Sequence, residues 1–465
     1  MKRFIAILAI CLLLLSSFSL FPAAADNGGF VIKDGVLLSY NGSASDVTVP
    51  STVYAVGDFA FAKNAHIVSV TIPDSVESIG SRAFYGCSSL KNVRGGTNVT
   101  SVGVYAFNGT QYFERSTDEF LILGKTLVWY NGDSMYITVP ESCVSIAPYA
   151  FLRSETVKMV RASSELVSVG AGAFYECQNL ENVSLTSSVT FIGPYAFEGT
   201  PFLDSLGAYA LLGDGILVKY QGGDSDVVIP DGIRRIDSHA FRSSKLSSVS
   251  IPGSVYSIDP FAFADCIGLS SVTLSEGLVM IGDGAFRGCR SLSGLTTPDT
   301  LAYIGQHAFD SSGLENIRLH GDRLIVSDNA FKDCKAMKYA LLANGVDALY
   351  DGSFAGCTAL EGISVPSDAS DISSAALSGC EKVVVTCAAS SAADTALSNN
   401  SVNNVIGDAD RDGELSILDA TEIQCNVAGL VGFSGAQTAA ADFDFNGVIN
   451  IIDAADVQMS LADLL

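Results

Sequence analysis

Two short stretches near the end of the chain place oxygen-bearing side chains at matching intervals. The first, GDADRDGELSILDATEIQ, holds five carboxylates and one arginine between Asp408 and Asp419. Numbered from Asp408, positions 1, 3, 5, 7, 9 and 12 are Asp408, Asp410, Asp412, Glu414, Ser416 and Asp419, with Gly413 at position 6. The second stretch begins 34 residues later and fills the same positions with Asp442, Asp444, Asn446, Val448, Asn450 and Asp453, with Gly447 at position 6.

This spacing suits a hard cation that takes roughly six to eight oxygen ligands, with a glycine for the sharp turn and a backbone carbonyl at position 7. A single acidic loop could equally be a solvated turn, but two copies in the same register argue against that alternative. Softer metals would call for His or Cys ligands. The stretches therefore predict two calcium ions, whose charge offsets the repulsion among the carboxylates, and folding coupled to their binding.

Each loop is followed by a related amphipathic segment, ILDATEIQCNVAGL or IIDAADVQMSLADLL, which predicts a helix. The stretch before the first loop, SNNSVNNVIG, is a poor helix former, so the copies are loop-then-helix units. Residues 407–465 thus resemble a type I dockerin, a small all-α calcium-binding domain. The resemblance implies calcium-dependent docking onto a cohesin domain of a scaffolding protein, as in the cellulosomes that break down polysaccharides.

In that family the recognition positions are 10 and 11 of each loop and 17 and 18 on the helix. Here they are Ile417, Leu418, Gln424, Cys425, Ile451, Ile452, Gln458 and Met459. The best-known clostridial members carry hydroxyl pairs at positions 10 and 11, so this departure puts the partner species in doubt and favours an apolar contact, nearer to ruminococcal types. Packing of Ile417 or Ile451 inside the domain is the alternative. The near-identical copies would allow binding in two orientations related by a half turn.

Most of the remaining chain is an internal repeat. Its anchor is a phenylalanine that recurs every 22 or 23 residues, except for two gaps of 44: Phe61, Phe84, Phe107, Phe151, Phe174, Phe197, Phe241, Phe263, Phe286, Phe309, Phe331 and Phe354, with Leu377 in the last place. A fixed period of this size is typical of a solenoid. Each unit predicts one strand of a parallel sheet over a continuous core, with the phenylalanine pointing inward.

Three inserts, GVLLSYNGSASDVTVP, KTLVWYNGDSMYITVP and GILVKYQGGDSDVVIP, open the array and fill the two long gaps. Each predicts two strands joined by an Asn-Gly or Gln-Gly-Gly turn, and therefore a hairpin at the edge of the solenoid. Seven cysteines stand three residues after an anchor: Cys87, Cys177, Cys266, Cys289, Cys334, Cys357 and Cys380. A thiol at one repeat position predicts a buried ladder of small apolar side chains, with disulfides between coils as an alternative that needs special geometry.

These features make residues 30–386 resemble the leucine-rich repeats of BspA-like surface proteins, which implies a binding role with a ligand that differs among members. The predicted organisation is a signal peptide (1–25), the repeat solenoid (26–390), a cap and linker (391–406) and the dockerin (407–465). The segment AASSAADTALSNN predicts a short capping helix. One column, two residues before the anchors, holds Phe59, Tyr105, Tyr149, Tyr195, His239, Phe261 and His307. It is either a recognition strip or packing along the edge of the coils.

The first residues carry Lys2 and Arg3, an apolar run from Phe4 to Leu15, and Ala23 and Ala25. They predict a cleaved secretory signal and not a membrane anchor, because the apolar run is shorter than the ~20 residues that a span needs. The chain has a formal charge of −24, which argues against a nucleic-acid partner. No transmembrane segment is predicted, and the expected location is extracellular, or at the cell surface through a scaffold.

The combined sequence predicts a non-catalytic binding component whose array binds a protein or a glycan. No Ser, Cys or His set has the surroundings of a nucleophile, and the four histidines are isolated or stand at variable repeat positions. The alternative is a carbohydrate-active enzyme with its active site on the solenoid, because a catalytic carboxylate pair contributed by separate coils stays open at this point.

Overall fold

The structure is a computed structural model that describes residues 28–343, 345–387, 391–398, 401–403, 409, 417–430, 432, 441, 449 and 451–463. The predicted signal peptide lies outside these residues. The chain divides into two compact units, one up to Thr117 and one from Asp118 onward. We call residues 28–403 the repeat array and residues 407–465 the tail. Within the described residues, no helix is both long enough and apolar enough to cross a bilayer.

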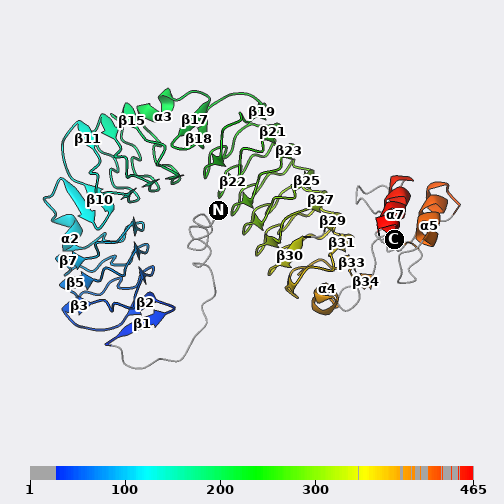
Figure 1. Ribbon diagram of the computed structural model, residues 1–465, viewed down its shortest axis with the longest axis horizontal. Coiled ribbons are helices and arrows are strands. Elements are labelled where there is room, and N and C mark those ends of the chain that lie inside the picture. Colours follow the sequence, from blue (N-terminus) through cyan, green and yellow to red (C-terminus); the bar gives the residue numbers. More distant parts are fainter. Residues whose placement is uncertain are drawn as a thin grey trace. The chain divides into compact units, whose positions relative to one another are not determined.

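A coil of the array contributes two strands, one to each of two parallel sheets, where the sequence predicted a single strand. In the coil anchored by Phe84, β5 (Ser69–Ile72) lies in one sheet and β6 (Ser78–Ile79) in another. The third side of the coil is a series of turns that carries the phenylalanine. Backbone bonds join the turns of successive coils, for example Phe61 N to Ala83 O at 2.7 Å. Every side of the coil is therefore hydrogen-bonded to its neighbour (Figure 1).

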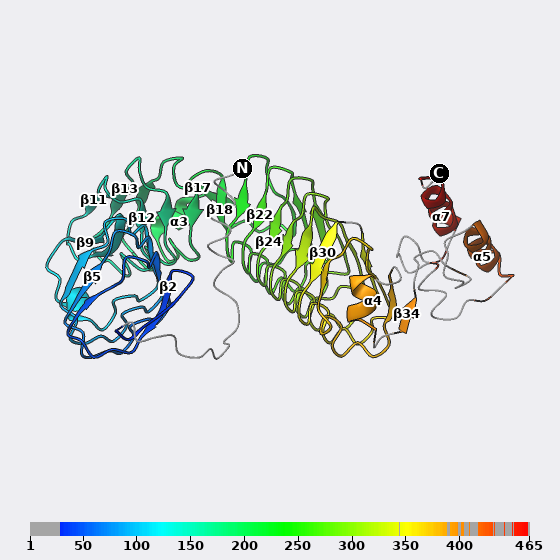
Figure 2. The ribbon, with the colours of Figure 1, turned by 60° about the horizontal axis from the view of Figure 1, so that its bottom comes forward.

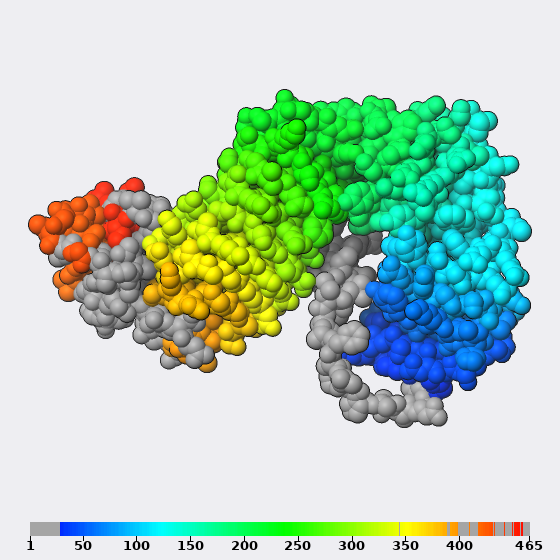
Figure 3. All heavy atoms as spheres, turned by 180° about the vertical axis from the view of Figure 1, so that it is seen from behind, coloured from blue at the N-terminus to red at the C-terminus, as the bar shows by residue number. Residues whose placement is uncertain are grey.

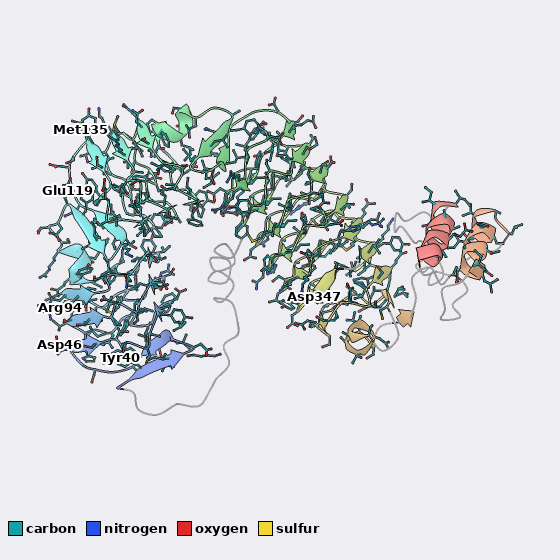
Figure 4. The ribbon with its side chains drawn as sticks, in the orientation of Figure 1. Tyr40, Asp46, Arg94, Glu119, Met135 and Asp347 are labelled. Carbon is teal, nitrogen blue, oxygen red and sulfur yellow. The ribbon has the colours of Figure 1, made fainter. Side chains whose placement is uncertain are left out.

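In the first unit, one sheet has the order β1-β2-β4-β6-β8 and the other the order β3-β5-β7. The remaining strands are β1 (Phe30–Lys33), β2 (Val36–Tyr40), β3 (Asp46–Thr48), β4 (Ala55–Val56), β7 (Asn92–Gly95) and β8 (Ser101–Val102). The short helix α2 (Gln111–Glu114) follows, capped by Thr110. Asp46 and Arg94 project from the exposed face of the β3-β5-β7 sheet (Figure 4).

The second unit opens with an equivalent pair of sheets, β16-β14-β12-β10-β9 and β11-β13-β15. Their strands are β9 (Phe120–Leu123), β10 (Thr126–Tyr130), β11 (Tyr136–Thr138), β12 (Ser145–Ile146), β13 (Met159–Arg161), β14 (Ser168–Val169), β15 (Asn182–Ser184) and β16 (Phe191–Ile192). Helix α3 (Pro201–Ser205) follows them, with Thr200 as its N-cap.

The longest run of coils follows α3. One sheet has nine strands: β17 (Tyr209–Leu212), β18 (Ile216–Tyr220), β20 (Arg235–Ile236), β22 (Ser257–Ile258), β24 (Met280–Ile281), β26 (Tyr303–Ile304), β28 (Leu324–Val326), β30 (Val346–Leu349) and β32 (Asp371–Ile372). The other side carries β19 (Asp226–Val228), β21 (Ser248–Ile251) and β23 (Ser271–Leu274), then β25 (Gly294–Thr296), β27 (Asn316–Leu319), β29 (Tyr339–Leu342), β31 (Gly362–Ser364), β33 (Val384–Thr386) and β34 (Ser401–Asn403). These coils pack into one continuous body (Figures 2 and 3).

The expected short helix near the end of the array is α4 (Ala392–Ala396), capped by Ser391. Ala393 and Leu397 are buried and join the core of the preceding coils. Strand β34 then pairs in parallel with β33. The repeat sheet thus continues to residue 403, inside the segment predicted as cap and linker.

Three hairpins are present, but the predicted pairing within each insert is wrong. Strands β2 and β3 of the first insert lie in different sheets, and β2 instead pairs antiparallel with β1, which precedes the insert. The turn between β1 and β2 is Asp34-Gly35, with φ of +47° and +73°, as a type I′ hairpin requires. Pairs β9/β10 and β17/β18 repeat the arrangement. The Asn-Gly segment carries the chain from one sheet to the next.

The core follows the phenylalanine anchors, as predicted. All twelve are at most 2% exposed, and rings of successive coils stack with centroids 4.7–5.3 Å apart. Tyr40, Tyr130 and Tyr220 take the place of the anchor ahead of each ladder and stack or tilt on the next phenylalanine at 4.9–5.3 Å. The inserts therefore supply the anchor that the long gaps lacked. Tyr112 of α2 and Phe202 of α3 meet the last ring of a ladder edge-on.

The seven repeat cysteines are buried free thiols, but their column is not simply apolar. Each Sγ donates to the carbonyl of the phenylalanine in the preceding coil, as in Cys177 Sγ to Phe151 O at 2.9 Å. The other coils place Asn, Ser or Thr at this position, which are also donors. Burial raises the pKa of Cys87, Cys177 and Cys266 to about 11. These thiols are therefore protonated at neutral pH and satisfy carbonyl groups.

The described part of the tail is built around α5 (Ile417–Val427) and α7 (Ile451–Asp463). Their shared core is small: Ala409, Ala420, Ile423, Ala441, Ala454 and Val457, with Ile449 against it. Ala420 and Ile423 stand 34 residues before Ala454 and Val457, so both copies contribute the same positions. The apolar core formed by the described residues of the tail is therefore small, which fits a domain stabilised in part by bound metal.

Candidate calcium and docking site

Most of the predicted calcium ligands lie outside the described residues. This holds for Asp408, Asp410, Asp412, Glu414, Ser416, Asp442, Asp444, Asn446, Val448 and Asn450. The two ligands at position 12, Asp419 and Asp453, are described. Each stands in the first turn of its helix, α5 or α7, and each is 0% exposed.

The burial of these two carboxylates tests whether the tail suits a cation. A carboxylate taken out of water needs a positive partner or several donors. Residues 407–465 contain eleven acidic residues and one basic residue, Arg411, so the tail has little positive charge of its own. Two buried carboxylates at equivalent positions, each closing a loop of oxygen-bearing residues, fit calcium in number and chemistry.

The residues just before each buried aspartate point outward. Ile417 and Leu418 are 58% and 59% exposed, and their counterparts Ile451 and Ile452 are 59% and 54% exposed. Successive helical residues are ~100° apart around the axis, so an inward position 12 leaves positions 10 and 11 at the surface. Ile417 and Ile451 are therefore not packed inside the tail, the alternative left open by the sequence.

The other predicted contact positions complete two similar faces. Gln424 and Gln458 are exposed, and Cys425 is half-buried. The side chain of Met459 lies outside the described residues. Each face thus offers a pair of large aliphatic side chains with a glutamine about two turns further along the helix. Large aliphatic groups exposed in two matching places on a small domain are typical of a contact surface.

A buried ionic cluster in the second unit was missed by the sequence. Arg235 bonds to Asp259 and Asp237, its Nη1 reaches Thr190 O at 3.3 Å, and its guanidinium lies 4.8 Å from the Phe191 ring centre. Arg235, Asp237 and Asp259 are 8%, 2% and 5% exposed. Burial is the main cause that raises the pKa of Asp237, with Asp259 adding to the rise and Arg235 opposing it.

A signal for this cluster was present in the repeat. The six earlier coils have Gly or Ala at the third position of this segment and no charge at the first, whereas Arg235-Ile236-Asp237 and Ser257-Ile258-Asp259 put charge at these buried positions. Arg235 thereby joins the coil of β20 to the last coil before α3. The cluster brings two carboxylates close together, as a catalytic pair would require. Both, however, are buried and bonded to Arg235.

Family comparisons cover nearly all of the described chain. The BspA type leucine rich repeat region, found in several copies, matches residues 37–117, 126–208, 224–338, 257–384 and 325–402, and the dockerin type I domain matches residues 406–462. No curated protein matches the chain.

Several solved structures are similar. A leucine rich cell surface protein from Faecalibacterium prausnitzii A2-165 is 26% identical, with 74% of this chain and 94% of that chain covered and a TM-score of 0.30. The pneumococcal vaccine antigen PcpA is 19% identical, with 80% and 94% covered and a TM-score of 0.34. A leucine-rich repeat protein from Eubacterium ventriosum ATCC 27560 is 18% identical, with 74% and 88% covered and a TM-score of 0.37.

Proposed function

The chain belongs to the BspA-type leucine-rich repeat family and carries a dockerin type I domain, and from this premise we propose that it is a secreted, non-catalytic component of a cohesin and dockerin assembly. The tail docks onto a cohesin domain of a scaffolding protein. The repeat array remains free to bind a protein or a glycan. The predicted signal peptide at residues 1–25 would deliver the chain to the outside of the cell, and the scaffold would hold it there.

The observation that carries the docking proposal is the match between the two exposed pairs of the tail. Ile417 with Leu418 and Ile451 with Ile452 follow the two loops at the same positions, and their exposed fractions agree within a few per cent. Because the copies are so alike, a cohesin that accepts one pair also accepts the other after a half turn. The contact is apolar at its centre, with Gln424, Cys425, Gln458 and Met459 further along the helices.

Calcium is the cofactor of this proposal, with one ion for each loop. The ligands would be the oxygens at positions 1, 3, 5, 7, 9 and 12, of which position 7 contributes its backbone carbonyl. Each ion would neutralise the carboxylates of its loop and fix the start of α5 or α7. Positions 10 and 11 are thereby held at the surface, so that metal binding and docking are coupled.

The non-catalytic assignment is supported by what the described residues of the array do with their reactive groups. Asp237 and Asp259, which lie close together, are at most 5% exposed and bonded to Arg235, so a polysaccharide cannot reach them. The repeat thiols are buried and, where the pKa is raised to about 11, protonated. The competing hypothesis of a carbohydrate-active enzyme predicts that the purified chain releases reducing sugars from plant polysaccharides.

The docking proposal is tested by replacing the first ligand of each loop. Asp408→Ala together with Asp442→Ala should abolish binding to a panel of type I cohesins while the circular dichroism of the array stays unchanged, and EDTA should have the same effect on the unaltered chain. Glu422→Ala, which removes a carboxylate of α5 outside the loops, is the matched control and should bind normally. Cohesin binding that persists in EDTA would refute the proposal.

A further inference from the structure

One column of the array has an unusual backbone. The residue two before each phenylalanine anchor has φ between +54° and +65°, the left-handed region, in both units. The members of this column, which we call the left-handed column, are Phe59, Arg82, Tyr105, Tyr149, Gly172, Tyr195, His239, Phe261, Gly284, His307, Asn329 and Gly352.

Large side chains in this column are unfavourable for the backbone, because a bulky residue with positive φ costs free energy. The left-handed region suits glycine, and bulky residues there are outliers that persist at functional sites more often than elsewhere. Gly172, Gly284 and Gly352 show that the coil closes equally well without any side chain. The aromatic and imidazole groups are therefore not needed to form the turn, which points to a role at the surface.

The rings of this column lie at the surface of the coils. Phe59, Tyr105 and Tyr195 are 53%, 39% and 42% exposed, and Tyr149, His239, Phe261 and His307 are half-buried. In the first unit, the Arg82 guanidinium lies between the rings of Phe59 and Tyr105, 5.6 and 5.9 Å from their centres. In the second unit, His239 lies 4.7 Å from Tyr195 and 5.4 Å from Phe261, measured between ring centres. Each unit thus has its own row of rings.

Glycines in the column make room for neighbouring rings. A Cβ at Gly172 would lie 2.4 Å from the Tyr149 ring, and one at Gly284 would lie 2.5 Å from the Phe261 ring. The two rings therefore lie across the next coil. At these two places the aromatic surface extends over a coil that has no side chain of its own in the column.

His239 adds a polar group to the row in the second unit. Its Nδ1 is buried and has no hydrogen-bond partner within the described structure. Burial and, to a lesser degree, Arg242 lower the pKa of His239, so the ring is neutral at pH 7. Because Nδ1 is buried, a hydroxyl group of a ligand would bond His239 at the other ring nitrogen, Nε2.

The shape of the row selects among ligands. It is one residue wide and runs from coil to coil. A second left-handed column, two residues after each anchor, holds glycine or serine in seven coils and a charged residue in five: Lys63, Arg153, Glu176, Asp265 and Asp333. A globular partner would have to desolvate those charges to reach the rings. A row this narrow suits a linear polymer better.

The backbone hydrogen bonds of the column and the charge of the chain also argue against two kinds of linear ligand, an extended peptide and an acidic polymer. Most amide groups of the column already bond between coils, as in Tyr149 N to Ala171 O at 3.1 Å and Phe261 N to Asp283 O at 2.9 Å. Among the column residues, the N–H groups of Tyr195 and His239 lack a bond to the next coil, and these are too few for an extended peptide to add a strand. The formal charge of −24 disfavours an acidic polymer.

We propose that the left-handed column binds a neutral polysaccharide. This proposal rests on the proposed function and specifies the ligand of the array. The apolar faces of successive sugar rings would lie on the aromatic side chains. Groups such as Arg82 and His239 would bond the hydroxyls.

The experiment is affinity electrophoresis of the full chain in gels containing xyloglucan, mixed-linkage β-glucan, galactomannan or arabinoxylan. At least one polysaccharide should retard the unaltered chain. A variant with Phe59→Gly, Tyr105→Gly, Tyr195→Gly and Phe261→Gly should bind at least tenfold more weakly. Its unfolding midpoint should stay equal or rise, because glycine suits the left-handed region. Tyr136→Ser, which removes a ring that is 68% exposed outside the column, should bind normally.

A set with Asn at the same four positions, which Asn329 shows to be accepted, replaces the glycine set if that one does not fold. The proposal is overturned if none of the four gels retards the unaltered chain, or if a folded variant binds as well as the unaltered chain does. Loss of a captured culture-filtrate protein without any effect on polysaccharide binding would indicate a protein ligand instead. Cohesin binding should be the same in every variant, so this test and the docking test fail independently.

Discussion

Both regions of the molecule are built by repetition, but the copies depend on one another in opposite ways. In the array each coil buries its phenylalanine between the rings of its neighbours, so a coil is incomplete without the next one. In the tail the two copies share a small core and present separate, equivalent outer faces. The stacked repeats of the array distribute stability over many coils, whereas the two repeats of the tail present the same surface twice.

The sources of stability differ accordingly. The array buries a phenylalanine or tyrosine in nearly every coil and satisfies its backbone groups coil by coil. The tail buries six small or medium apolar residues among the described ones, and it also buries Asp419 and Asp453. We expect the array to fold without metal, and the tail to depend on calcium.

The largest effect should come from breaking a ladder in the array. Phe286→Ala removes a ring that stacks on Phe263 and Phe309, and it should lower the free energy of unfolding by about 3–5 kcal/mol. Guanidinium denaturation followed by far-ultraviolet circular dichroism measures this. Tyr136→Ser should change it by about 0.5 kcal/mol or less. Cohesin binding by the tail should not change, and a loss there would mean that the two regions are not independent.

A smaller effect should separate the hydrogen bond of the thiol column from its packing. Cys177→Ala removes one of the two donors to the Phe151 carbonyl, which keeps its bond from Ser154 N at 3.0 Å, and should cost about 1 kcal/mol beyond the loss of the sulfur's own burial. Cys177→Ser keeps a hydroxyl donor at the site and should be less damaging. Both variants are measured by denaturation. If they lose the same free energy of unfolding, the thiol contributes only apolar packing, as the sequence suggested.

The smallest effect should come from removing one face of the tail. Ile417→Ser with Leu418→Ser should weaken cohesin binding about twofold, or about 0.4 kcal/mol, because the second face still binds. Ile451→Ser with Ile452→Ser should do the same, and the fourfold variant should not bind. Titration calorimetry with one cohesin distinguishes these cases. A large loss from either pair alone would show that the two faces are not interchangeable.

The features of the fold that could be predicted from the sequence are those that recur in every repeat. The phenylalanine anchors, the parallel sheets and the buried cysteines could be recognised because every coil carries the same positions, and an error in one unit is corrected by the others. The calcium loops were predicted for the same reason, since two copies in one register suggest the same ligand positions. Whether those ligands meet a metal stays a prediction.

The strands of the hairpins were paired wrongly because a turn motif in the sequence does not show which two strands it connects. Asn41-Gly42 resembles a tight turn, yet residues 41–45 lead from one sheet to another, while Asp34-Gly35 makes the hairpin. Strand β1 is only four residues long, and its counterparts β9 and β17 precede the other two inserts in the same way, so the partner of β2 is marked by a short pattern that lies outside the insert itself. Pairing across a turn depends on both strands, and only one of them was conspicuous.

The left-handed column could have been recognised from its occupants. Glycine stands at Gly172, Gly284 and Gly352, and Asn329 stands at a fourth position of the column. Glycine and asparagine are the residues that tolerate positive φ best, so their recurrence at one repeat position indicates a left-handed backbone although bulky residues fill most of the other places. The ion cluster of Arg235 is harder to predict, because its partners lie on two coils and only stacking brings them together.

The most direct test of the division between a metal-free array and a calcium-dependent tail is hydrogen exchange of the full chain, followed by mass spectrometry with calcium and with EDTA. Peptides from 417–427 and 451–463 should be protected in calcium and lose that protection in EDTA, while peptides from 28–387 should exchange alike in both. Protection of α5 and α7 that survives EDTA, or a loss of protection across the array, would contradict this account.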